Sequence, residues 1–340
     1  MNARAPATSS PMRQGVLVAV DIGGTKTQLS SYDAVTGALR RFRLSTHADG
    51  LVGRPALHRL IDAAKRCAQI GSDNPLLGIA AVFPGIVHEG HLLMAPHTPG
   101  LEGMDLCGEF ATAFGDAPII LDNDVKAGAL AEHAWGALRG ADQALYLNIG
   151  TGLAAAAIIN GEVYRGRNGA ALEIGYQLTP FLDGIDASQW TGWRDGMAPM
   201  EDLFSGAALD ALAQQALGHN RTARDLFCST EPTLRQDLQR RIHALAAQLV
   251  NLSIAFDVER IAIGGGVSRQ YPAFEQDLLQ LLQRLVPFPP TLSGARFAED
   301  APLWGALELA RRAAHLPALP DSIFDAATNA GSEPSVQSSA

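Results

Sequence analysis

The chain has 340 residues, of which 47% are hydrophobic and 18% charged, and its formal net charge is −9. This length exceeds what one hydrophobic core usually serves, so the composition favours a folded protein of two domains and excludes disordered and fibrous classes. No basic run is present, which argues against a nucleic-acid partner. An anionic ligand would therefore be held locally, by backbone N–H groups or a metal.

The cysteines and the chain ends suggest a reducing compartment. Cys67, Cys107 and Cys228 are odd in number and widely spread, so neither a disulfide framework nor a Cys-x-x-Cys metal site is expected. Residues 1–14 lack the apolar core of a signal peptide, and no apolar stretch is long enough to span a bilayer. We expect a cytoplasmic protein without a membrane partner, with loose tails at 1–14 and 326–340.

The first half of the chain alternates apolar runs with helical spacing. Val16–Val20 has the β-branched character of a buried strand, and a glycine-rich turn separates it from a second extended segment. A later apolar run is stopped by Pro84-Gly85, and another leads into Asp122-Asn-Asp124. The predicted elements are strands over 16–20, 28–32, 76–83 and 118–121, and helices over 51–70 and from Asp124 to about Ala134.

The second half follows a similar plan. Asn160-Gly161 is a strong signal for a hairpin between two strands. A long amphipathic run follows Pro232, and three glycines follow a short apolar strand. The predicted elements are strands over 144–148, 154–159 and 260–263, a mainly helical region over 201–257, and a last helix from Pro302 to Ala314.

One internal similarity relates the two halves. Val18–Thr25 aligns with Leu145–Gly152, because each is an apolar strand followed by Asp or Asn, Ile, Gly and a Gly/Thr pair, and each leads into another strand. A repeat at this long period predicts two related halves, each opening with a β-hairpin.

The two hairpin turns are candidate phosphate sites. Successive glycines expose backbone N–H groups that bind phosphate oxygens, and threonine hydroxyls add donors, although either turn alone is equally well explained as a tight hairpin. The predicted phosphate-binding residues are Gly23, Gly24, Thr25, Lys26, Gly150, Thr151 and Gly152. Gly264, Gly265 and Gly266 are predicted to lie against adenosine, with a simple strand-to-helix turn as the alternative.

Two other phosphate motifs are rejected. Gly150–Ala155 resembles the G-x-G-x-x-A dinucleotide fingerprint, with Glu173 about 20 residues on, but that fingerprint needs a helix directly after the turn. A strand is predicted there instead. The P-loop pattern occurs nowhere in the chain.

Carboxylates at two strand ends are candidates for phosphoryl transfer. Asp124 follows a strand and precedes a helix, which suits a base that accepts the proton of an attacking hydroxyl. Asp21 ends the first strand and is placed to hold Mg²⁺ through water, because Mg²⁺ keeps most of its hydration shell. Asp122 is interpreted only as a capping residue.

In this order and spacing the motifs resemble those of the ROK family of bacterial sugar kinases and repressors, within the actin-like ATPase superfamily. The resemblance runs from about Val16 to Ala314. It implies an α/β fold of two actin-like (RNase H-like) domains, with mixed sheets flanked by helices and a cleft between them. The implied domains are 15–123 with about 302–325, and 124–301. The matching segments are Asp21–Lys26, Pro84-Gly85, Asn123-Asp124, Gly150–Gly152, Gly166–Gly175, Ile263–Gly266 and Leu303–Ala306.

The resemblance also implies a sugar site. Asp124 would be the catalytic base, and Asn123, Glu173 and Glu201 would bind sugar hydroxyls through directional hydrogen bonds. Without the resemblance, Glu173 and Glu201 would be read as solvated surface carboxylates. His97 stands where relatives usually have Asn, and it is a further candidate for the sugar site.

The chain departs from the family pattern in three places besides His97. Tyr176 replaces the histidine of the family's Glu-x-x-His motif, and we include it among the sugar-site candidates. Residues 177–200 contain no cysteine or histidine, so no zinc is expected. Trp190 and Trp193 in that segment either fill the place of the zinc loop or stack on a sugar. Lys126 is unusual so near the base; at a helix start it is expected to point away from Asp124, whose pKa it would otherwise lower.

These features predict ATP- and Mg²⁺-dependent phosphorylation of a hexose or hexose derivative, with a glucose-type sugar favoured. The alternative is a non-catalytic, sugar-sensing regulator of the same fold. The family's repressors carry an N-terminal helix-turn-helix, for which we expect no room before Val16. The sugar, the hydroxyl, polyphosphate as the donor and the oligomeric state stay open, a homodimer being an expectation from the family only.

Overall fold

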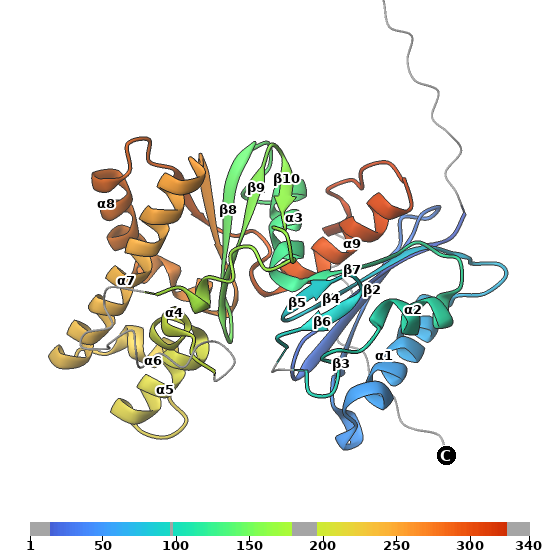
Figure 1. Cartoon of the computed structure of the whole chain (residues 1–340), viewed down its shortest axis with the longest axis horizontal. Helices are drawn as coiled ribbons and strands as arrows, with labels where there is room; N and C mark the ends of the chain where they lie inside the picture. The colour runs from blue at the N-terminus through green and yellow to red at the C-terminus, as the bar shows by residue number, and fades with distance from the viewer. Residues whose placement is uncertain (1–13, 96–97, 179–195, 325–340) are drawn as a thin grey trace, which may run out of the picture. The chain divides into compact units, whose positions relative to one another are not determined.

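The computed structural model describes residues 14–95, 98–178 and 196–324 (Figure 1). The chain forms two compact units. The first contains the chain up to Asp124 and again from Ala306, and the second is Val125–Gly305. The domain bounds inferred from the sequence stay a prediction.

The first unit is built on a mixed five-stranded sheet of order β3-β2-β1-β4-β7. Strands β1, β2 and β3 are antiparallel neighbours, whereas β4 and β7 run parallel to β1. A separate antiparallel pair, β5 and β6, follows β4. The strands are β1 (Val16–Ile22), β2 (Lys26–Asp33), β3 (Leu39–Ser45), β4 (Leu76–Phe83), β5 (Ile86–His88), β6 (His91–Leu93) and β7 (Ile119–Asn123).

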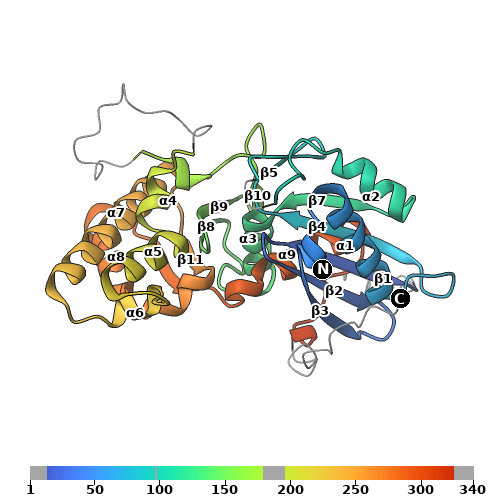
Figure 2. The ribbon, with the colours of Figure 1, turned by 90° about the horizontal axis from the view of Figure 1, so that it is seen from below.

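Helices cover both faces of this sheet. Alternate residues of β1, such as Val18 and Val20, pack with α1 (Gly53–Ala68) and α2 (Leu106–Phe114) in one core. Helix α9 (Ala301–Ala313) lies on the opposite face, as Figures 1 and 2 show. Its close approach requires glycine at position 78, since a Cβ there would lie 2.9 Å from the carbonyl oxygen of Ala310.

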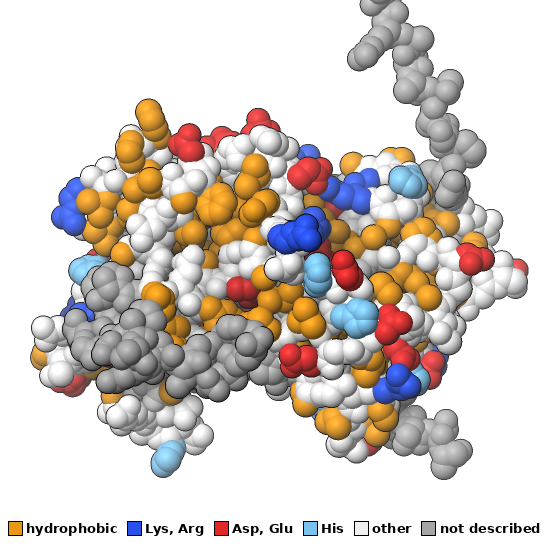
Figure 3. Space-filling model, viewed as in Figure 1, with side chains coloured by type: hydrophobic (Ala, Val, Ile, Leu, Met, Phe, Trp, Pro, Cys, Tyr) orange, Lys and Arg blue, Asp and Glu red, His pale blue; other side chains and the backbone are white. Residues whose placement is uncertain are grey.

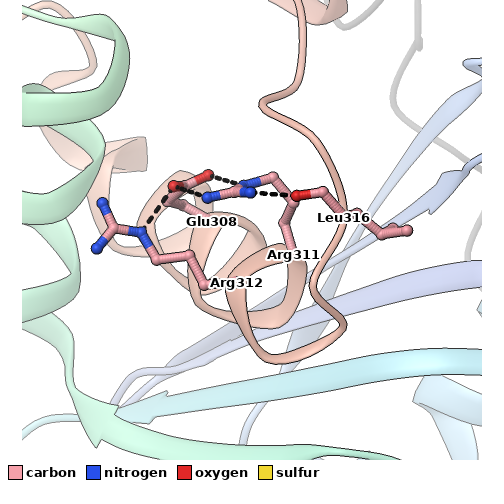
Figure 4. A network of polar contacts seen from close by, with 4 residues as sticks. All are labelled: Glu308, Arg311, Arg312 and Leu316. Carbon is pink, nitrogen blue, oxygen red and sulfur yellow. Dashed lines mark hydrogen bonds and ion pairs between the residues drawn. The ribbon is translucent and has the colours of Figure 1, made fainter. Parts of the chain in front are cut away.

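A polar network closes the end of α9 (Figure 4). Glu308 is 4% exposed and accepts two hydrogen bonds from the Arg311 guanidinium, at 2.7 and 2.6 Å, and one from Nε of Arg312 at 2.8 Å. Arg311 also donates to the carbonyl oxygen of Leu316 beyond the helix. The buried carboxylate is thereby paired, and the chain after α9 is tied back to the helix.

The second unit has a sheet of the same order, β10-β9-β8-β11-β12. In both sheets an antiparallel hairpin is followed by parallel strands, which confirms the two related halves predicted from the repeat. Asn160 and Gly161 have φ values of 54° and 75° and form the predicted tight hairpin. The strands are β8 (Gln143–Ile149), β9 (Leu153–Ile159), β10 (Glu162–Tyr164), β11 (Arg260–Gly264) and β12 (Thr291–Gly294).

The two faces of this second sheet meet different helices (Figure 1). Tyr146 is fully buried against α3 (Asp124–Trp135), where Gly128 and Gly264 leave room for its ring: a Cβ at either would lie within 2.8 Å of it. Leu145 and Leu147 face the larger core. The helices on that side are α4 (Pro199–Leu203), α5 (Gly206–Leu217), α6 (Ala223–Cys228), α7 (Pro232–Phe256) and α8 (Glu275–Leu285).

Candidate active site

The first hairpin presents its glycine-rich turn at the end of β1. Asp21 pairs with Gln28 across the hairpin, and the N–H of Gly23 donates to the carbonyl oxygen of Lys26 at 3.0 Å. The hydroxyl of Thr46, just after β3, donates to the carbonyl oxygen of Gly23 at 2.7 Å. Thr25 at the tip is exposed. The hydrogen bond from Thr46 therefore holds the turn on one side, and the tip at Thr25 is exposed to solvent.

Polar residues gather where the parallel strands of the first unit end. Asp21 on β1 is in register with Val82 on β4, which is in register with Asp122 on β7. Two strand spacings put the backbones of Asp21 and Asp122 about 10 Å apart. Asn123 is 3% exposed and donates from Nδ2 to the carbonyl oxygen of Gly85 at 2.8 Å. The predicted residues Asp21 and Asn123 thus share one edge of the sheet.

Asp124 follows Asn123 directly and is the first residue of α3. The backbone N–H groups and the dipole of a helix N-terminus favour negative charge at that position. Asp122 accepts a 2.9 Å hydrogen bond from the N–H of Asn123, which precedes the helix, so the capping role of Asp122 stays a prediction. Asp124 thus stands at the junction of β7 and α3, with its backbone held by a strand on one side and a helix on the other.

The second hairpin turn, Gly150–Gly152, is braced by α5. Gly206 N–H donates to the carbonyl oxygen of Gly150 at 2.8 Å, and Ala207 N–H donates to that of Thr151 at 3.1 Å. A Cβ at Gly206 would lie 2.4 Å from the oxygen of Gly150, so only glycine permits this approach. The first turn of α5 therefore sets the conformation of the predicted phosphate turn.

The glycines after β11 lie against the same turn. Gly265 has φ 81°, and a Cβ there would lie 2.4 Å from the carbonyl carbon of Ile149. The fold therefore brings the segment predicted for adenosine next to the segment predicted for phosphate, although the two are far apart in sequence. Gly264 also has a packing role, because it makes room for Tyr146.

One predicted sugar residue, Glu201, contacts this turn, and two others lie near Glu201. Glu201 on α4 accepts a 2.8 Å hydrogen bond from the N–H of Leu153, directly after Gly152. Glu173 precedes a 3-10 helical turn, Ile174–Tyr176, that carries the third candidate, Tyr176. Gly175 in that turn packs on Glu201, since a Cβ there would be 3.2 Å from Glu201 Cβ. The predicted residues Glu173, Tyr176 and Glu201 are thus close neighbours.

Glu173 has a partner that the sequence did not identify. The ammonium of Lys126 lies 3.5 Å from its Oε1, and the side chain of Lys126 is 1% exposed. The pKa of Glu173 is raised from its ordinary value, mainly by burial and also by the negative charge of Glu201, while the positive charge of Lys126 opposes the rise. The only sequence signal was a lysine in the first turn of the helix that begins at Asp124.

The loop before Glu173 borders a surface pocket of about 330 Å³. Its lining includes the aromatic rings of Tyr164 and Phe256, with Leu172 and Leu252. Figure 3 shows hydrophobic side chains exposed over β8–β10 on this face. The loop that leads to Glu173 therefore forms one side of a pocket that is open to solvent.

Several sequence predictions fall on residues that are not described. His97, Trp190 and Trp193 lie outside the described ranges. Within residues 14–95, 98–178 and 196–324, no group of three or more His, Cys, Asp or Glu side chains is arranged to hold a metal ion. In the same ranges, none of the helices combines the length and apolar character needed to span a bilayer.

Two helix-covered sheets of the same strand order, each opening with a glycine-tipped hairpin, define a protein of the actin-like two-domain class. The chain belongs to the ROK family, whose family model matches residues 17–313. The N-acetyl-D-glucosamine kinase of Pectobacterium carotovorum is 28% identical over 84% of this chain and 96% of that protein. The N-acetylmannosamine kinase of Salmonella arizonae is 27% identical over 86% of this chain and 98% of that protein. The ROK glucokinase of Streptomyces griseus, solved with glucose and AMPPNP, is 25% identical, with a TM-score of 0.67 over 88% of this chain and 100% of that one.

Proposed function

We propose that the chain is an ATP-dependent sugar kinase that phosphorylates a hydroxyl of a hexose or an N-acetylhexosamine. The observation that carries the proposal is the position of Asp124, which opens α3 beside the anchored Asn123, at the sheet edge that also holds Asp21. The relatives named as kinases of N-acetylglucosamine, N-acetylmannosamine and glucose support the same reaction class and leave the sugar open.

In the proposed reaction, Asp124 accepts the proton of the attacking hydroxyl. The hydroxyl oxygen forms a bond to the γ-phosphorus of ATP, while the bond from that phosphorus to the β–γ bridging oxygen breaks and ADP leaves. Asp124 stands at the N-terminus of a helix, a position that favours negative charge. Its role is that of a general base in an otherwise electrostatic and positional catalysis.

The glycine-rich turns are proposed to bind the nucleotide. Gly23–Lys26 and Gly150–Gly152 supply N–H groups to phosphate oxygens, and Gly264–Gly266 lies against adenosine. Magnesium bound to the nucleotide neutralises phosphate charge. Mg²⁺ keeps most of its hydration shell, so a single carboxylate is enough to bind it through water. We assign this role to Asp21 at the end of β1.

The sugar is proposed to bind to carboxylate, amide and phenol groups. Asn123, Glu173, Tyr176 and Glu201 are the assigned residues, and the predicted contact of His97 lies outside the described ranges. Charged acceptors facing hydroxyls form directional hydrogen bonds that select stereochemistry. A cytoplasmic location and a homodimer stay predictions.

A coupled assay of ADP release tests the proposal directly. Glucose, mannose, glucosamine, N-acetylglucosamine and N-acetylmannosamine are each supplied with ATP and Mg²⁺, and polyphosphate replaces ATP in a parallel series. We expect sugar-dependent ADP release with at least one neutral hexose or N-acetylhexosamine. ATP binding without turnover of any sugar would favour the alternative of a sugar-sensing regulator, for which the replacement of the family histidine by Tyr176 is the motivating observation.

A further inference from the structure

Lys126 and Glu173 form a mostly buried ion pair from two separate segments of the second unit. Lys126 lies in the first turn of α3, and Glu173 lies just before the Ile174–Tyr176 turn. The Nζ to Oε1 distance is 3.5 Å, and the side chains are 1% and 21% exposed. The lysine is covered, whereas its carboxylate partner keeps contact with solvent.

This arrangement has a physical cost that a purely structural role does not require. Taking an ammonium group out of water is unfavourable, and an apolar side chain of similar length would fill the same space without that penalty. The first turn of α3 does not favour a cation at position 126, because a helix N-terminus disfavours positive charge. The ion pair with Glu173 supplies a functional reason for a cation at this position.

A direct contact of Lys126 with substrate is disfavoured by its burial. With 1% of its side chain exposed and its ammonium against Glu173, it does not present a free cation to a phosphate or to an acidic sugar. Glu173, by contrast, keeps an exposed fraction through which a sugar hydroxyl can reach it. The pair as a whole is electrically neutral, which suits an uncharged sugar.

We propose that Lys126 is a positioning residue that fixes the carboxylate of Glu173 through their ion pair, so that the carboxylate accepts hydrogen bonds from the hydroxyls of a neutral sugar. This inference rests on the proposed function, because it assumes that Glu173 contacts the sugar. Lys126 lies outside the motifs from which the sugar site was predicted, and its proposed effect on the sugar is exerted through Glu173.

The charges around Glu173 determine how the pair responds to pH. Lys126 approaches it from α3 and Glu201 from α4, and of the two only Lys126 favours the ionised form. Removing the ammonium leaves burial and Glu201, both of which raise the pKa of Glu173. Glu173 would then take up a proton at a higher pH, and the protonated carboxyl is a weaker acceptor for a sugar hydroxyl.

The test is the pH dependence of kcat/KM for the sugar in the wild type, Lys126→Met, Lys126→Arg and the control Lys65→Met. Lys65 is a partly exposed lysine on α1 in the first unit. For Lys126→Met we expect the KM of the sugar at pH 7 to rise about tenfold and the acid limb of kcat/KM to move to higher pH. Lys126→Arg, which keeps the charge, should restore the position of the acid limb, and Lys65→Met should match the wild type.

A double variant, Lys126→Met with Glu173→Gln, covers the case in which Lys126→Met does not fold, because it removes both charges of the pair and leaves no unpaired charge at position 173. We expect the double variant to fold, to keep a raised KM for the sugar and to lose the part of the acid limb that Glu173 contributes, while the part due to the general base Asp124 stays. Wild-type KM and pH profile in either Lys126→Met or the double variant would overturn the role of Lys126. Absence of turnover by the wild type with every sugar would overturn the proposed function and this inference together, and is therefore distinguishable from the first result.

Discussion

The carboxylate of Glu201 accepts a 2.8 Å hydrogen bond from the backbone N–H of Leu153, although the two residues are 48 positions apart. This bond ties α4 to the residue that follows the Gly150–Gly152 turn. A Cβ at Gly152 would lie 2.4 Å from the same carboxylate oxygen, so the turn and the carboxylate are in close contact. Glu201, predicted from the family resemblance to bind sugar, is thus also a brace of the predicted phosphate turn.

The first prediction separates these two roles of Glu201. Glu201→Ala removes the acceptor for Leu153 N–H, and we expect the KM of ATP to rise about tenfold because the turn loses a charge-assisted hydrogen bond. Glu201→Gln retains an amide oxygen that can accept the same bond, so its KM for ATP should stay near that of the wild type. Steady-state kinetics with varied ATP measures both. An unchanged KM for ATP in Glu201→Ala would show that the brace is dispensable.

The second prediction concerns Asp124. Asp124→Asn keeps the size of the side chain but removes the proton acceptor, and we expect kcat to fall by about 10²–10⁴ while sugar binding persists. The measurements are kcat from ADP release and the dissociation constant of the sugar from calorimetry. Asp116→Asn, at an exposed aspartate between α2 and β7, is the control and should keep the wild-type kcat. Turnover by Asp124→Asn at the wild-type rate would refute its role as base.

The third prediction compares adjacent glycines after β11. Gly265→Ala introduces a Cβ 2.4 Å from the carbonyl carbon of Ile149, at φ 81° and ψ 176°, where side chains are strongly disfavoured. We expect the free energy of unfolding of the second unit to fall by about 2–4 kcal/mol. At Gly266 the nearest atom to an added Cβ is 3.8 Å away, so Gly266→Ala should be close to neutral in stability. Urea unfolding of both variants decides the point, and equal stability would contradict the strained close approach.

The fourth prediction uses the network at the end of α9. Arg311 makes two hydrogen bonds to the buried Glu308 and one to the carbonyl oxygen of Leu316, and its side chain is 15% exposed. We expect Arg311→Ala to destabilise the first unit by about 2 kcal/mol. Arg312 contributes one bond and is 34% exposed, so Arg312→Ala should cost less than about 1 kcal/mol. A larger loss from Arg312→Ala in thermal or urea unfolding would reverse the ranking.

The fifth prediction is a pH effect at the β2–β3 turn. Hydrogen bonds from the N–H groups of Thr36 and Val35 to the Asp33 carboxylate lower its pKa from the ordinary value of 3.8. Because the folded pKa is depressed, the stabilisation is present above pH 3.8 and is lost as the pH falls through the lower folded value. Asp33→Asn should therefore show a weaker fall of the melting temperature on acidification than the wild type. Parallel acid slopes in the two proteins would count against the contribution of Asp33.

Local sequence was enough to predict the elements that carry chemistry. The β-branched run before Asp21 and the apolar run before Asp122 are short-range signals of strands, and the structure confirms both, the first as a buried strand and the second with its apolar residues partly buried. Asn160-Gly161 specifies its own turn through backbone conformation, independently of the rest of the fold. The repeat between the two hairpins predicted related halves, and the identical order of the two sheets confirms them.

Other elements escaped prediction because their pattern depends on a neighbour. In β3, Arg40, Arg41 and Arg43 interrupt the apolar alternation, and the strand is defined by its pairing with β2 at one edge of the sheet. Edge strands of this kind have weak local signals. Helix α8 was not predicted either, although its local signal is strong: Leu278 and Leu282 stand four positions apart on one apolar face and pack into the core of the second unit.

The amino-acid sequence by itself determined which residues stand at the strand ends, because strand, turn and helix propensities act over a few neighbouring positions. Only the tertiary structure decided which of these residues meet: Lys126 with Glu173, Gly265 with Ile149, and Glu201 with Leu153. Such contacts join segments that are distant in the chain, and they depend on how helices and sheets pack, which no local periodicity encodes.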